Sequence, residues 1–153
     1  MRTVSLLGIL ALGVAACGGG DADDPDAGYN CDNDPRDEAF VAGLEKVGAG
    51  GTTFRLVSSD PAPPARGDNA WVLEVETGGA PMAGATVDVT PFMPDHQHGS
   101  PVAVEVTPTG TDGRYDAAPL NFWMPGLWEI TVEAAPAGGG ATDDVVFRFC
   151  IPA

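Results

Sequence analysis

The sequence predicts an all-β fold with one short helix near its N-terminus. The first observation is that short runs rich in β-branched and aromatic residues alternate with turns that contain glycine and proline. These runs predict strands at Thr52–Ser58, Asn69–Glu76, Ala85–Thr90, Val102–Thr107, Gly113–Ala117, Leu127–Ala134 and Val145–Cys150. About seven short strands separated by turn signals are typical of an immunoglobulin-like β-sandwich.

The second observation is that apolar and polar residues alternate within these runs. Trp71, Leu73 and Val75 fall on one face of their strand, and Glu74 points to the other. A later strand repeats the pattern around Trp128. One face of each strand is therefore expected to be buried, with Trp71 and Trp128 packed in the core between two sheets.

The helix is predicted just before the first strand. Asp34 suits an N-cap position and Pro35 the first helical position, while Gly48 is a stop signal. Between them, apolar residues recur at helical spacing at Phe40, Val41, Leu44 and Val47. We expect this helix to pack against the sandwich.

The N-terminus has the features of an export signal. Arg2 supplies a positive charge, and Val4–Ala16 is a largely apolar run that is short for a membrane span. It ends in small residues directly before Cys17, which resembles the lipobox of bacterial lipoproteins. We therefore expect a signal peptide over 1–16 and a lipid on Cys17; the alternative is an ordinary secretory signal that leaves Cys17 free.

Residues 17–30 then form an acidic, glycine-rich stretch with almost no apolar residue, a composition typical of a disordered tether. If the organism is Gram-negative, Gly18 after the cysteine resembles the sorting signal of an outer-membrane lipoprotein. Loss of residues 1–16 removes Arg2 and changes the formal net charge from −15 to −16. Such a negative charge disfavours nucleic acid as a partner. The expected contact with the membrane is through the lipid anchor.

Residues 31–153 are expected to form one domain, flanked by Cys31 and Cys150. Two cysteines in an exported domain indicate a disulfide. The alternative is a pair of metal ligands, although no Cys-x-x-Cys spacing supports it.

Both histidines of the chain lie in the segment Met93–Gly99, as His96 and His98. Extended backbone would place them on one face, where they could bind the same ion. Met93 and Met124 are the candidate thioether ligands. Imidazole and thioether together favour copper; Cu(II) would add an oxygen donor such as Asp95, and zinc would need a carboxylate beside the histidines. The alternative is a solvated loop with methionines that only fill the core.

Three segments together resemble the YtkA-like domain family over about residues 50–135. They are Asn69–Val75 followed by Gly79–Val87, the Met-Pro-x-His-x-His-Gly pattern of Met93–Gly99, and Gly113–Tyr115 with Met124–Trp128. The resemblance implies a small exported β-sandwich with a role in copper handling. In such modules Tyr115 would make a hydrogen bond at a corner of the sandwich.

The sequence therefore favours a binding module over an enzyme. It has no Gly-x-Ser-x-Gly elbow and no glycine-rich phosphate loop that opens a helix. The first hypothesis is a membrane-tethered module of the cell envelope that binds copper for metal tolerance or delivery. The second is a structural lipoprotein that binds an envelope protein and no metal.

Overall fold

The computed structural model describes Cys31 and residues 34–153. The predicted signal peptide 1–16, the lipidated Cys17 and the tether that follows it to residue 30 lie outside the described residues. In the part of the chain that is described, no helix is long and apolar enough to cross a membrane.

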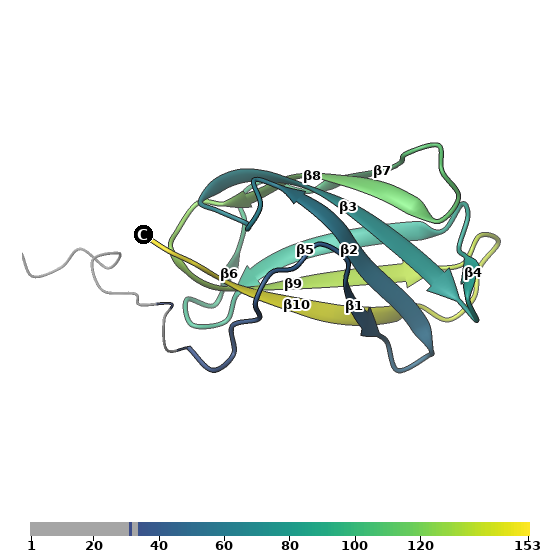
Figure 1. The fold of residues 1–153 in the computed structure, drawn as a ribbon, viewed down its shortest axis with the longest axis horizontal. Helices are drawn as coiled ribbons and strands as arrows, with labels where there is room; N and C mark the ends of the chain where they lie inside the picture. The colour runs from purple at the N-terminus through teal and green to yellow at the C-terminus, as the bar shows by residue number, and fades with distance from the viewer. Residues whose placement is uncertain (1–30, 32–33) are drawn as a thin grey trace, which may run out of the picture.

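Two antiparallel sheets lie face to face (Figure 1). The larger has the order β1-β2-β3-β8-β7, with β4 paired to β3, and its strands are β1 (Leu44–Val47), β2 (Thr52–Asp60), β3 (Gly67–Thr77), β4 (Ala80–Pro81), β7 (Glu105–Pro108) and β8 (Arg114–Phe122). The smaller has the order β10-β9-β5-β6, formed by β5 (Thr86–Met93), β6 (His98–Gly99), β9 (Gly126–Ala135) and β10 (Asp143–Ile151). The predicted β-sandwich is confirmed.

Each of the seven predicted strands overlaps an observed one, and the structure adds three short strands, β1, β4 and β6. β4 and β6 have two residues each, which is too short for an alternating pattern. β5 continues past its predicted end at Thr90 to Met93. This extension carries the strand directly into the histidine segment.

The predicted N-terminal helix is wrong. Residues 34–43 form turns and irregular backbone, and Leu44–Val47 is strand β1, paired with β2. The helical spacing of the apolar residues does not define a buried stripe, because Val41 and Val47 are exposed. Phe40 instead packs its ring edge-on against Phe149, with the ring centroids 6.1 Å apart.

The acidic residues that suggested a helix start serve the edge of β10. The carboxylate of Glu38 accepts a hydrogen bond from the backbone N–H of Arg148 (3.0 Å), and that of Asp37 accepts one from Cys150 (2.8 Å). The backbone N–H of Glu38 donates to the carbonyl of Arg148 (3.0 Å). These bonds occupy polar groups of an edge strand, which would otherwise be open to another chain.

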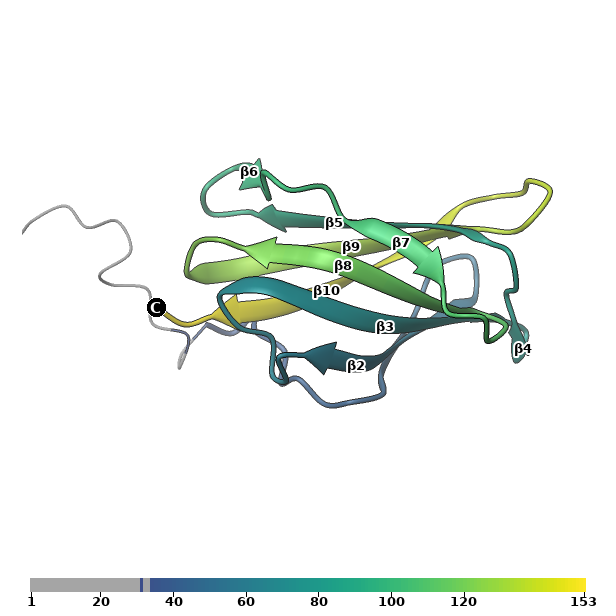
Figure 2. The ribbon, with the colours of Figure 1, turned by 90° about the horizontal axis from the view of Figure 1, so that it is seen from above.

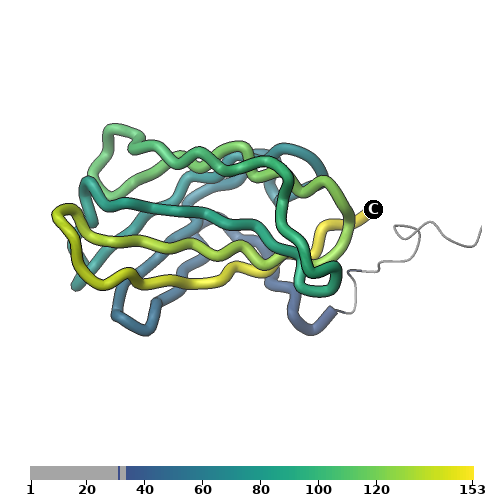
Figure 3. Tube along the Cα trace, turned by 180° about the vertical axis from the view of Figure 1, so that it is seen from behind, coloured from purple at the N-terminus to yellow at the C-terminus, as the bar shows by residue number. Residues whose placement is uncertain are grey.

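The predicted disulfide is confirmed between Cys31 and Cys150, with a Cα–Cα distance of 5.4 Å across 119 residues of sequence. It ties the start of the described chain to the end of β10. Figure 3 shows the first residues of the described range 34–153 beside this end of the sandwich.

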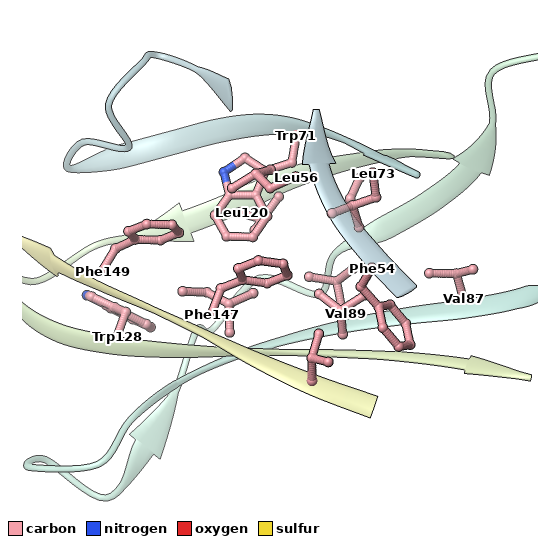
Figure 4. Close-up of a cluster of buried hydrophobic side chains, with 14 of the residues drawn as sticks. Phe54, Leu56, Trp71, Leu73, Val87, Val89, Leu120, Trp128, Phe147 and Phe149 are labelled. Atoms are coloured by element: carbon pink, nitrogen blue, oxygen red, sulfur yellow. The ribbon is translucent and has the colours of Figure 1, made fainter. Parts of the chain in front are cut away.

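The core fills the space between the sheets (Figure 4). The ring of Trp71 meets Phe149 and Phe147 edge-on, with centroid distances of 5.7 and 6.2 Å. Trp128, from the other sheet, lies 5.2 Å from the ring of Phe122. Both tryptophans are fully buried, so their predicted role as packing anchors is confirmed.

Tyr115 makes the predicted corner hydrogen bond. Its ring is buried, and its hydroxyl donates to the carbonyl of Met82 (2.6 Å) and accepts from the backbone N–H of Ala85 (2.9 Å). The hydroxyl therefore holds the turn between β4 and β5 against β8.

Asp143, at the start of β10, anchors the turn between β1 and β2. Its carboxylate accepts hydrogen bonds from the backbone N–H groups of Gly50 (2.9 Å) and Thr52 (2.8 Å). These bonds, that of Gly50 first, lower the pKa of Asp143 below its ordinary value. A Cβ atom at Gly48 would lie 2.5 Å from the same carboxylate, which explains the glycine there.

Candidate metal site at one end of the sandwich

The histidine segment is the turn of a β-hairpin. β5 pairs with β6 through Phe92 with Gly99 and Met93 with His98, so residues 94–97 form the loop. The backbone N–H of Gln97 donates to the carbonyl of Met93 (2.9 Å), and Gln97 has a φ of +57°. The backbone between the two histidines is therefore not extended, contrary to expectation.

The turn nevertheless brings the two imidazoles together. The ring centroids of His96 and His98 are 5.7 Å apart. Two imidazoles with nitrogens about 2 Å from one ion have centroids at most about 6 Å apart. The observed separation is within that limit, so the distance between the rings is compatible with a shared ion.

His98 also has a hydrogen bond that suits a ligand. Its Nδ1 lies 3.2 Å from the carbonyl oxygen of Gly99. Because a carbonyl only accepts, this contact places the proton on Nδ1 and leaves the lone pair on Nε2. Histidine ligands commonly orient their second nitrogen in this way.

Trp123 forms a wall beside His98. Their rings are stacked with a centroid distance of 5.2 Å, and Trp123 is 42% exposed. Its carbonyl accepts a hydrogen bond from Nε of Arg66 (3.2 Å). The connection from β8 to β9 and the hairpin loop thus meet at one end of the sandwich (Figure 2).

Sequence reasoning did not give Trp123 a role at the site. The available signal was that it stands immediately before Met124-Pro125, in the same segment as a candidate ligand. Its exposure distinguishes it from Trp71 and Trp128, which are buried.

The two candidate methionines are in the core. Met93 is 0% exposed and Met124 is 9% exposed. Met93 is the direct cross-strand partner of His98, which places the two side chains on the same face of the hairpin. An ion on the inner side of the His98 ring would therefore lie toward the Met93 thioether. Met82 is in the corner turn bonded to Tyr115, away from this hairpin.

Asp95, the expected oxygen donor, forms an ion pair. Arg36 donates through its two terminal nitrogens to both carboxylate oxygens of Asp95, at 2.8 and 2.7 Å. The same guanidinium bonds Asp34 at 2.9 and 2.7 Å. The hydrogen bonds of Arg36, that to Asp95 contributing most and that to Asp34 next, raise the pKa of Arg36 above its ordinary value. The guanidinium therefore remains charged.

The candidate donors are thus two imidazoles, with Met93 as the cross-strand partner of His98. Among Cys31 and residues 34–153, no group of three or more His, Cys, Asp and Glu residues could hold a metal ion. A zinc site completed by a carboxylate is not assembled in this region. Imidazole and thioether donors fit a soft ion such as Cu(I), which tolerates few ligands.

The two packed sheets define a small β-sandwich domain. The YtkA-like family matches residues 46–133, more than half of the chain, so the chain belongs to the YtkA-like family. The predicted resemblance over about residues 50–135 is therefore confirmed.

Among solved structures, the chain is similar to a copper-bound variant of FetP from a uropathogenic Escherichia coli strain. The TM-score is 0.44 at 12% identity, and the match covers 71% of this chain and 89% of that chain. A likeness this distant does not transfer the ligand of FetP to this chain. No curated protein matches the sequence.

Proposed function

We propose that the protein is an exported copper-binding module and not an enzyme, with His96 and His98 as the primary ligands. The observation that carries this proposal is the 5.7 Å separation of the two rings in one hairpin turn, where Nδ1 of His98 contacts the carbonyl of Gly99. Met93 and Met124 are the candidate thioether ligands.

The site favours Cu(I) on chemical grounds. Two imidazoles satisfy an ion that accepts few ligands, and a thioether adds a soft donor. Met93 is closed off from water, so it can reach only an ion held on the inner face of the hairpin, beside His98. Trp123, in the connection from β8 to β9, stacks on the ring of His98.

The proposed place of action is the cell envelope. A lipid on Cys17 would anchor the chain, and the acidic residues up to position 30 would act as a tether. Gly18 favours the outer membrane if the organism is Gram-negative. There the module would hold copper for metal tolerance or delivery.

The test is a competition titration with Cu(I) and Cu(II) on the disulfide-bonded protein. We expect one bound ion per chain, and its loss in the variant His96→Ala/His98→Ala. Met93→Leu or Met124→Leu is expected to weaken Cu(I) binding by about tenfold or more if the residue is a ligand, corresponding to about 1.4 kcal/mol.

Met82→Leu is the matched control, because it removes a thioether far from the hairpin and is expected to leave binding unchanged. The proposal is wrong if the double histidine variant binds both copper ions as tightly as the wild type.

The second candidate is a structural lipoprotein that binds an envelope protein. It is favoured by the burial of Met93 and Met124 among core residues, where a methionine needs no ligand role. On this hypothesis the histidine variant keeps full copper tolerance in cells, and a specific envelope protein is recovered with the wild-type chain.

A further inference from the structure

We propose that Arg36 is a positioning residue that sets the ion selectivity of the candidate site. By binding the carboxylate of Asp95, it keeps an anionic oxygen donor away from the histidines and so disfavours Cu(II) and Zn(II) relative to Cu(I). This inference rests on the proposed function.

Asp95 is the donor that the site would otherwise use. It directly precedes His96 in the four-residue loop, and its side chain is 38% exposed. Both of its oxygens are bound by Arg36 at 2.8 and 2.7 Å. A carboxylate held by two parallel hydrogen bonds has a defined direction, so it does not turn freely toward an ion.

Arg36 is itself held in place. Asp34 accepts hydrogen bonds from both the side chain and the backbone N–H of Arg36, at 2.7 to 2.9 Å. Asp37 and Glu38 bind the edge of β10, and the disulfide fixes Cys31 to the same strand. The guanidinium is therefore delivered to the hairpin loop by a segment attached at several points.

The contact between Arg36 and Asp95 affects selectivity because Cu(I), Cu(II) and Zn(II) prefer different ligands. Zn(II) is almost always bound by four protein ligands in structural sites, and Cu(II) favours imidazole together with oxygen. Cu(I) accepts imidazole and thioether alone.

The experiment measures the affinities of Cu(I), Cu(II) and Zn(II) for the chain as purified from its host envelope, with the disulfide intact. Arg36→Gln is expected to tighten Cu(II) and Zn(II) binding by about two- to fivefold, the size of one exposed ion pair, and to change Cu(I) binding less. Arg36→Lys keeps the charge but cannot make both parallel hydrogen bonds to Asp95, so the ratio of Cu(I) affinity to Cu(II) and Zn(II) affinity is expected to lie between those of Arg36→Gln and the wild type.

Two further variants distinguish the release of Asp95 from the mere loss of a positive charge. In an Asp95→Asn background, Arg36→Gln is expected to have no effect on the ratio. Arg114→Gln, which removes an equal charge from an arginine paired with Glu74, is expected to leave it unchanged. The electron paramagnetic resonance spectrum of bound Cu(II) should gain an oxygen ligand in Arg36→Gln and lose it again when Asp95 is also replaced.

The inference is overturned if Arg36→Gln changes all three affinities by the same factor, or if its effect persists without Asp95. If copper binding depends on the histidines but Arg36→Gln leaves the ratio of the affinities unchanged, this inference is wrong and the proposed function stands. A wild-type chain that binds none of the three ions overturns the proposed function and the inference with it.

Discussion

Replacement of Tyr115 by phenylalanine tests whether the corner hydroxyl stabilises the sandwich. The change leaves the buried ring in place and removes two hydrogen bonds, one to the carbonyl of Met82 and one from the N–H of Ala85. A net contribution of about 1 kcal/mol for each bond predicts a loss of about 2 kcal/mol in the free energy of unfolding.

Urea unfolding followed by the fluorescence of the buried tryptophans measures this loss. With a denaturant slope of about 2 kcal/mol per molar, the midpoint is expected to fall by about 1 M. Thr90→Val is the control, because it removes an exposed hydroxyl from β5 and should change stability by less than about 0.5 kcal/mol. A loss of that small size in Tyr115→Phe would refute the reasoning.

The remaining predictions concern the disulfide and the carboxylate of Asp143. Cys31→Ser/Cys150→Ser is expected to lower the free energy of unfolding by about 4–5 kcal/mol, the chain-entropy value for a loop of this length, and chemical denaturation measures it. Because the folded pKa of Asp143 is lowered, its stabilising effect is complete above about pH 4 and is lost as the pH falls toward the folded pKa. Asp143→Asn should therefore be less stable than the wild type at neutral pH, and its unfolding midpoint should fall less steeply as the pH is lowered below about 4. An unchanged dependence of the midpoint on pH in this acid range would contradict the assigned contacts.

Alternation predicted the strands that are long enough to show it. β3 buries every second residue from Asn69 to Val75, and β9 does so from Trp128 to Ala134, because one face of each strand packs in the core. The helix prediction failed where local signals had no tertiary counterpart. Asp37 and Glu38 suit a helix N-terminus, but they bind the edge of β10, a partner more than 100 residues away in sequence.

The candidate site was predicted in its residue types and not in its geometry. His96 and His98 were identified because both histidines share one short segment with a methionine. Their approach depends on the turn at Gln97, where a non-glycine residue takes a positive φ that no local pattern indicates. The stack of His98 on Trp123 depends on two loops from different strand connections.

The sequence by itself determined the period of the strands, the membership in the YtkA-like family and the pairing of the two domain cysteines. These follow from local alternation, from the motifs shared with the family and from the count of cysteines. Only the tertiary structure decided which residues surround the histidines. The burial of Met93, the wall at Trp123 and the capture of Asp95 by Arg36 each join segments far apart in the chain. Such contacts arise from the packing of two sheets and from the loops at their end, and no spacing within one segment encodes them.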